Sequence, residues 1–154
     1  MPIPRGAFGL VKEIARHLLR RPVVGLVAVA RVPDGRLVLI RRSDTGQWAL
    51  PGGTLEWGET LRTTLTRELS EEAGVRVLEA QELLGVYSDP GRDPRFHAVT
   101  VVVAARVSLP EQAPMNPLEI LEVGLFEPAL VPQPLSHRLD DVLANALKNT
   151  TFWE

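Results

Sequence analysis

The chain has 154 residues, of which 45% are hydrophobic and 23% charged, a length that supports one sizeable core and argues against two domains. Its 17 basic and 19 acidic residues give a formal net charge of -2, so overall charge favours neither nucleic acid nor an anionic membrane as a partner. The absence of cysteine excludes disulfides, thiolate nucleophiles and cysteine zinc sites, and leaves carboxylates or histidines as metal ligands. We expect a single domain over residues 1–154 of a cytoplasmic protein.

Residues 8–21, FGLVKEIARHLLRR, carry apolar side chains at helical spacing, with charged side chains on the other face. The charges interrupt the apolar run that a signal sequence needs, and Pro22 ends the pattern. No stretch of about 18 uncharged apolar residues occurs, as a membrane-spanning helix would require. We interpret residues 1–21 as a helical extension that packs on the domain or on the partner subunit of a homodimer. A helix lying on a membrane surface is the less favoured alternative.

The next segments predict a hairpin and then a helix. Residues 23–31 and 36–42 are β-branched or aliphatic runs, joined by Pro33-Asp34-Gly35 in a manner typical of adjacent antiparallel strands. A tight backbone turn is expected within residues 47–54, which contain Pro51-Gly52-Gly53. Residues 59–73 are predicted to be helical, with Gly74 ending the helix.

The second half of the chain predicts two further strands and a last helix. Residues 75–87 and 96–107 are expected to be strands, and the VTVVVAA run in the second is typical of a central strand. Turn-forming residues make 89–95 a loop. Residues 136–149 have helical periodicity with Ser136 at the expected N-cap. The expected fold is α/β, a mixed sheet covered by helices on both sides, with an extra N-terminal helix.

The candidate chemistry lies in the helix after the glycine turn. Glu68, Glu71 and Glu72 stand at positions i, i+3 and i+4 and therefore share one helical face. Like charges at this spacing destabilise a helix by a few tenths of a kcal/mol per pair, whereas a hard divalent cation would turn the repulsion into coordination. A solvated acidic face is the alternative for this run taken alone, so the wider context decides.

That context is a segment with many specified positions. Gly53 is followed at fixed spacing by Glu59, by Arg67-Glu68-Leu69, by Glu71-Glu72 and by Gly74-Val75. This segment resembles the Nudix box in full, and the preceding Trp48 to Gly52 resembles the lead-in of that family. The resemblance extends over about residues 22–148 and implies a Nudix-like α/β/α sandwich. Departures at Thr64, Leu65 and Leu125-Phe126 concern local packing.

The resemblance implies a metal-dependent hydrolase of nucleoside diphosphates linked to another group. Glu68, Glu71 and Glu72, with a carbonyl of Gly52 or Gly53, would bind Mg2+, with Mn2+ as a substitute. Arg67 and Glu59 would orient the metal-binding glutamates. Water would attack one phosphorus and release a nucleoside monophosphate and a phosphorylated product. Glu68 or Glu72 would act as general base, with Glu119 and Glu122 as alternatives in a late loop.

The substrate is expected to be read outside the box. Pro90, fifteen positions after Val75, and the surrounding YSDPGRDPRFH resemble the loop of ADP-ribose pyrophosphatases, so that ADP-ribose or a nucleotide sugar is the favoured substrate. We expect substrate contacts from five residues, which are Arg41, Trp48, Tyr87, Arg92 and Arg95.

Three alternatives remain open: a nucleoside triphosphate pyrophosphohydrolase that removes noncanonical nucleotides, a dinucleoside polyphosphate hydrolase, and a ligand sensor without turnover. The intact box argues against the sensor. The missing basic surplus argues against long RNA as a substrate.

Overall fold

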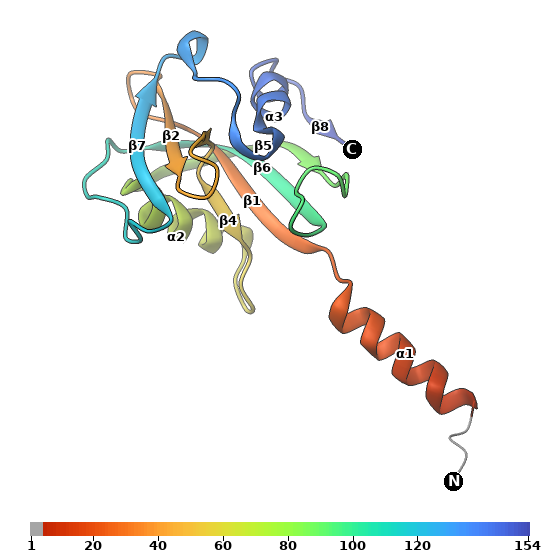
Figure 1. Ribbon diagram of the computed structural model, residues 1–154. Helices are drawn as coiled ribbons and strands as arrows, with labels where there is room; N and C mark the ends of the chain where they lie inside the picture. The colour runs from red at the N-terminus through yellow and green to blue at the C-terminus, as the bar shows by residue number, and fades with distance from the viewer. Residues whose placement is uncertain (1–4) are drawn as a thin grey trace.

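A computed structural model describes residues 5–154, and its centre is an eight-stranded mixed sheet (Figure 1). The strands are β1 Val23–Arg31, β2 Leu37–Arg42, β3 Trp48–Ala49, β4 Gly52–Thr54, β5 Val77–Tyr87, β6 Ala98–Val107, β7 Ile120–Phe126 and β8 Phe152–Trp153. Their order is β3-β2-β1-β6-β5-β8, while β4 pairs with β1 and β7 pairs with β2. The expected α/β fold with a mixed sheet is confirmed.

The parallel pair β1 and β6 forms the middle of the sheet. Nine consecutive residue pairs join the two strands, from Val23 opposite Ala98 to Arg31 opposite Arg106. Ala28, Val29 and Ala30 of β1 are at most 3% exposed, because this strand is covered on both faces. The prediction that residues 96–107 form a central strand is confirmed, since β6 lies between β1 and β5.

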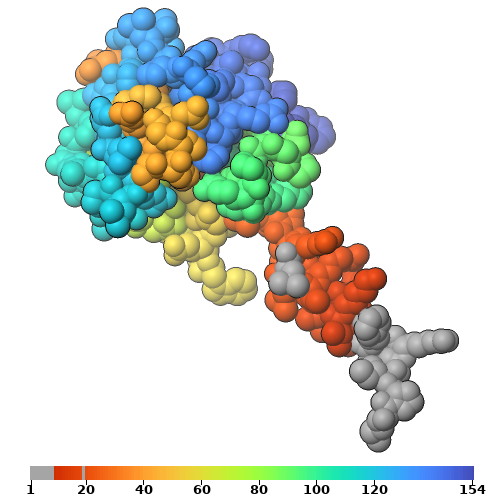
Figure 2. Space-filling view, in the orientation of Figure 1, coloured from red at the N-terminus to blue at the C-terminus, as the bar shows by residue number. Residues whose placement is uncertain are grey.

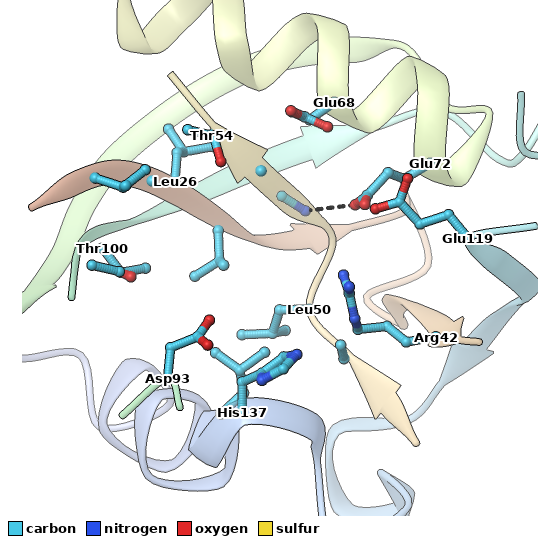
Figure 3. Close-up of a pocket in the computed structure, with 18 of the residues that line it drawn as sticks. Leu26, Arg42, Leu50, Thr54, Glu68, Glu72, Asp93, Thr100, Glu119 and His137 are labelled. Atoms are coloured by element: carbon cyan, nitrogen blue, oxygen red, sulfur yellow. Dashed lines mark hydrogen bonds between the residues drawn. The ribbon is translucent and has the colours of Figure 1, made fainter. Parts of the chain in front are cut away.

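Helix α2, Leu61–Ala73, packs its apolar side on the sheet through Leu65, Leu69 and Ala73. It begins at the N-cap Thr60, whose hydroxyl accepts a hydrogen bond from the backbone N–H of Thr63 over 3.2 Å. Helix α3, Leu139–Ala146, lies on the other side of strands β1 and β4 from α2 (Figure 3). The two helices therefore flank the sheet, as expected.

Gly74 ends α2 in the left-handed conformation, with φ of 64°, as predicted. A side chain here would be strained by its backbone angle. It would also place a Cβ 1.9 Å from the carbonyl oxygen of Gln112. Glycine is thus required both by the backbone conformation and by the close approach of a second segment.

Two details of the sequence prediction are wrong. Ser136 does not cap the last helix, because it belongs to a 3-10 helix, η2 Ser136–Arg138, and α3 starts three residues later behind Arg138. His137 and Arg138 both have positive φ, 53° and 57°, a backbone path that local periodicity does not reveal. Glu122 lies in β7 rather than in a loop. A short 3-10 helix, η1 Pro128–Leu130, follows β7.

Helix α1, Arg5–Leu19, extends away from the sheet (Figures 1 and 2). Leu10, Val11, Ile14 and Leu18 are between 49% and 72% exposed. Among the side chains of this helix that the structure describes, packing on the domain, one of the two predicted arrangements, is not observed. None of the helices within residues 5–154 combines the length and the hydropathy needed to cross a membrane.

Candidate active site beside helix α2

A cavity of about 670 Å³ opens between α2, the strands β1 and β4 and the η2–α3 segment (Figure 3). This size is in the range of pockets that enclose small ligands. One wall is acidic and comes from α2. The other wall carries arginines, an aspartate and a histidine from the end of β2, from the loop before β6 and from η2.

The acidic wall contains the three glutamates that the sequence placed on one helical face. Glu68, Glu71 and Glu72 all border the cavity. Glu72 is buried, the Glu68 side chain is 12% exposed and that of Glu71 is 42% exposed. Three carboxylates therefore reach the cavity from successive turns of α2, because Leu65 and Leu69 hold the adjacent face of the helix against the sheet.

Glu72 is the most deeply placed of these carboxylates. Its Oε2 accepts a hydrogen bond from the backbone N–H of Gly52 over 2.9 Å (Figure 3). Burial nevertheless raises the pKa of Glu72 to about 8, and the nearby Glu68 carboxylate acts in the same direction. The protein's own contacts thus offset only part of the cost of burying the charged form of Glu72.

Glu68 lies against a second glycine of the turn. A Cβ at Gly53 would stand 2.1 Å from its Oε1, so that only glycine leaves room for the carboxylate where it now lies. Burial also raises the pKa of Glu68, although Arg67 opposes the shift. The glycine turn and the helix are therefore shaped around one another at both Glu72 and Glu68.

Arg67 organises the polar side of the helix. Its Nε and Nη2 donate hydrogen bonds to the two carboxylate oxygens of Glu59 over 2.8 and 3.0 Å, and its Nη1 donates to Glu68 over 2.9 Å. The hydroxyl of Thr64 also donates to Glu59 over 2.9 Å. The hydrogen bonds from Arg67 hold the pKa of Glu59 at about 2, while those to Glu59 raise the pKa of Arg67. Arg67 is thereby fixed between the two glutamates.

The donor set fits a hard divalent cation by its chemistry. Three carboxylates line the wall, and two of them have pKa values raised by burial, a charge distribution that a cation would relieve. Across residues 5–154, however, no three acidic or histidine side chains already converge around a common point. Glu71 lies 3.6 Å from Arg67, so coordination requires that its side chain turns toward Glu68 and Glu72.

The opposite wall contains Arg42 and Arg95, each paired with an aspartate, and a histidine. Arg42, with a side chain 15% exposed, donates to Asp44 over 3.0 and 2.9 Å. Arg95 donates to Asp93 over 2.9 and 2.7 Å. The Nε2 atom of His137 is buried without a hydrogen-bond partner among residues 5–154, and burial lowers the pKa of this imidazole. The acidic helix thus faces a wall of polar groups able to bind a ligand.

The five residues expected to contact substrate fall into two groups. Tyr87, Arg92 and Arg95 border the cavity, whereas Arg41 and Trp48 do not. Arg41 donates to the carbonyl of Gly46 over 3.0 Å, and Trp48 packs edge-on against the ring of Phe126 with centroids 4.8 Å apart.

Among the cavity residues that sequence reasoning missed are Arg42, Asp93 and His137. The twofold alternation of side chains along a strand was the available signal for Arg42, since neighbours on a strand point to opposite faces. Arg42 instead of Arg41 therefore reaches the cavity. His137 had no such signal, because its position depends on the positive φ angles of η2. Glu119, named only as an alternative base, also borders the cavity.

Comparisons with known proteins agree with this geometry. The model of the NUDIX domain matches residues 19–146. An ADP-ribose pyrophosphatase of Methanocaldococcus jannaschii is 44% identical over 72 residues, which make up 45% of this chain and 42% of that protein. The chain thus spans less than half the length of this curated relative.

Two solved structures are similar over most of the chain. The MutT NUDIX hydrolase of Burkholderia pseudomallei is 32% identical, with a TM-score of 0.70 over 82% of this chain and 98% of that one. An ADP-ribose pyrophosphatase of Streptococcus suis is 25% identical, with a TM-score of 0.71 over 87% of this chain and 100% of that one. With the domain match and the acidic helix of the cavity, these likenesses show that the chain belongs to the Nudix hydrolase family.

Proposed function

We propose that this chain hydrolyses the diphosphate linkage of a nucleoside diphosphate derivative, with ADP-ribose or a nucleotide sugar as the favoured substrate. The observation that carries the proposal is the row of three carboxylates from α2 in one wall of a ligand-sized cavity, Glu68, Glu71 and Glu72. Arg42 and Arg95 line the cavity as well, each hydrogen-bonded to an aspartate. A diphosphate between the two walls would meet guanidinium groups on one side and a metal site on the other.

The three glutamates would hold Mg2+, or Mn2+ in its place, which when bound neutralises phosphate oxygens and lowers the pKa of water. Glu59 and Arg67 would orient the metal ligands. Glu59 fixes Arg67 by a hydrogen bond, and Arg67 in turn donates to Glu68. The N–H of Gly52 fixes Glu72 in the same way. The Gly52 carbonyl remains a proposed further ligand.

A carboxylate must also accept the proton of the attacking water. Glu68 and Glu72 are two candidates, and their buried positions raise their affinity for a proton. Glu119 is the third, because it borders the same cavity just before β7. Glu122 does not border the cavity, and its carboxylate lies 3.5 Å from Arg41.

Two observations support a nucleotide sugar or ADP-ribose as substrate. The similar proteins of Methanocaldococcus jannaschii and Streptococcus suis are ADP-ribose pyrophosphatases by name. The cavity extends from α2 to the loop at residues 92–96, which supplies Arg95 and Phe96 to its lining. This loop is the segment that resembles ADP-ribose pyrophosphatases in the sequence. A substrate with a group beyond its diphosphate would reach it.

The test is product release from ADP-ribose, nucleotide sugars, dinucleoside polyphosphates and nucleoside triphosphates in the presence of Mg2+. We expect ADP-ribose or a nucleotide sugar to be hydrolysed fastest, with a nucleoside monophosphate as product. Glu72→Gln should lower turnover by about 100-fold or more. Glu79→Gln, on an exposed part of β5, is the matched control and should leave it unchanged.

Each other outcome has a definite meaning. If a nucleoside triphosphate is hydrolysed fastest, the proposed substrate class is wrong, whereas the proposed metal site stands. Binding of the ligands by wild type without any turnover would make the chain a sensor and overturn the proposed reaction.

A further inference from the structure

Arg92 lies at the centre of an ionic cluster whose two carboxylates, from Asp141 and Glu154, are partly exposed. Its side chain is 12% exposed. Nη1 and Nη2 donate to the carboxylate of Asp141 over 3.0 and 2.9 Å, and Nε and Nη2 donate to the carboxylate of Glu154. All three guanidinium nitrogens are therefore engaged with two carboxylates from the far end of the chain.

Glu154 also binds the loop backbone directly. Its Oε2 accepts hydrogen bonds from the N–H groups of Ser88 and Asp89 over 2.8 and 2.6 Å. Its own N–H donates to the carbonyl of Val86 over 3.0 Å, beside the end of β5. One carboxylate thus joins the first residues of the loop to the guanidinium of Arg92, which lies further along the same loop.

Two aromatic rings, of Tyr87 and Phe152, stack beside the ionic cluster of Arg92. The guanidinium carbon of Arg92 lies 4.5 Å from the centroid of the Tyr87 ring, and that ring stacks on Phe152 with centroids 5.0 Å apart. Phe152 belongs to β8, which pairs with β5 at Gly85 and Val86. The strand that delivers Glu154 is therefore held against the sheet next to the residues it must reach.

The charge of this cluster argues against a direct grip on phosphate. One guanidinium between two carboxylates has a net charge of -1, which repels an anionic group. The loop, however, supplies three other residues to the cavity, which are Asp93, Arg95 and Phe96. Their positions depend on the path of the backbone between Ser88 and His97, and hence on what fixes that path.

We propose that Glu154 is a positioning residue for substrate binding, which acts through Arg92 to hold residues 88–97 in the path that presents Arg95 to the cavity. This inference rests on the proposed function, because it assumes that the cavity binds the substrate. It replaces the expectation that Arg92 itself binds the substrate. The two ideas predict opposite effects of removing the Glu154 carboxylate.

The experiment compares wild type with Glu154→Ala, Glu154→Gln and Arg92→Lys. Glu82→Ala, on an exposed part of β5, is the control. Steady-state kinetics with the best phosphoanhydride substrate gives KM and kcat separately, and hydrogen–deuterium exchange follows the backbone amides of residues 88–97. The exchange measurement needs no substrate, so a failure of the proposed function and a failure of this inference are distinguishable.

We expect Glu154→Ala to raise KM about tenfold, with kcat within about twofold of wild type. The hydrogen bonds of Glu154 and Arg92 run to residues 86–89, to Asp141 and to each other rather than to α2. The amides of Ser88 and Asp89 should exchange faster, while those of α2 keep their protection. Glu154→Gln should give values of KM and of amide exchange between those of wild type and Glu154→Ala, since its amide oxygen still accepts from the loop N–H groups. Arg92→Lys should raise KM as well, because a lysine cannot bridge two carboxylates.

An unchanged or lower KM in Glu154→Ala, together with a raised KM in Arg92→Lys, would overturn the inference and make Arg92 a direct substrate ligand. Unaltered exchange at residues 88–97 would overturn it too. A fall in kcat as large as the rise in KM would point to a general loss of structure and would count against a positioning role.

Discussion

The backbone N–H of Gly52 donates a hydrogen bond to the buried carboxylate of Glu72 over 2.9 Å, and so joins the glycine turn before α2 to the last turn of that helix. This contact offsets only part of the desolvation of Glu72, whose pKa burial raises to about 8. A negative charge on Glu72 therefore destabilises the protein when no metal is bound. The same charge becomes favourable when a cation binds beside it.

The first prediction concerns Glu72→Gln. The amide keeps an acceptor for the Gly52 N–H and removes the buried charge, so we expect the metal-free protein to melt at the same temperature as wild type or higher. Hydrolysis should fall by about 100-fold or more, since even supporting residues of metal sites contribute 10- to 100-fold. Mg2+ should raise the melting temperature of wild type and leave that of the variant unchanged. An equal Mg2+ shift in both proteins would contradict the assignment.

The second prediction uses the two glycines of the turn. At Gly53, an added Cβ would meet the carboxylate of Glu68 at 2.1 Å, whereas at Gly52 it would meet the backbone oxygen of Leu26 at 2.1 Å. A side chain moves aside more readily than a strand, so Gly53→Ala should lower activity at least tenfold with a small change in melting temperature. Gly52→Ala should destabilise the fold by about 2 kcal/mol or more. Thermal melts of both variants, measured beside their activities, check this difference; equal losses of stability would refute it.

The third prediction concerns Arg67→Lys. The arginine contacts both oxygens of Glu59 and also Glu68, a forked arrangement that a lysine ammonium does not reproduce. We expect activity to fall about 10- to 100-fold as Glu68 loses its fixed position. Arg62→Lys, on an exposed position of α2, is the matched control and should retain wild-type activity. Equal activity in the two variants would remove Arg67 from the supporting role.

The fourth prediction concerns acid stability. The hydrogen bonds from Arg92 lower the pKa of Glu154 from 4.5 to about 2. A carboxyl group with a lowered pKa in the folded state contributes stability that is full above about pH 4.5 and is lost as the pH falls toward 2. Glu154→Gln should therefore melt below wild type at pH 7, and the two melting temperatures should converge as the pH approaches 2. A difference in melting temperature that stayed constant across this pH range would show that the ionised carboxylate of Glu154 contributes nothing to stability.

The acidic helix was predictable because its signals are local. Glycine at its end, the spacing of its glutamates and its apolar face are all contained within residues 53–75, and the structure places each of them as expected. A short sequence window carries this information whenever one helix supplies all the ligands of a site.

The far wall of the cavity was less predictable because it depends on contacts between distant segments. Arg92 is far from its partners in sequence: Glu154 lies 62 residues away and Asp141 lies 49 residues away. When these two acidic partners are not known, a basic residue such as Arg92 in a loop after the motif is readily interpreted as a residue that binds phosphate. The same holds for His137, which reaches the cavity only through two residues with positive φ.

Gly74 has a consequence that reaches beyond the helix it ends. Its carbonyl accepts a hydrogen bond from Glu111 over 2.8 Å, the carbonyl of Glu71 accepts one from Met115 over 2.8 Å, and Gln112 crosses directly over the glycine. The end of α2 is therefore a docking point for the segment that leads to Glu119. Glu72 and Glu119, which border the cavity from separate stretches of the chain, are therefore both connected to the end of α2. A substitution that displaced residues 111–115 would shift both carboxylates within the cavity without replacing either of them.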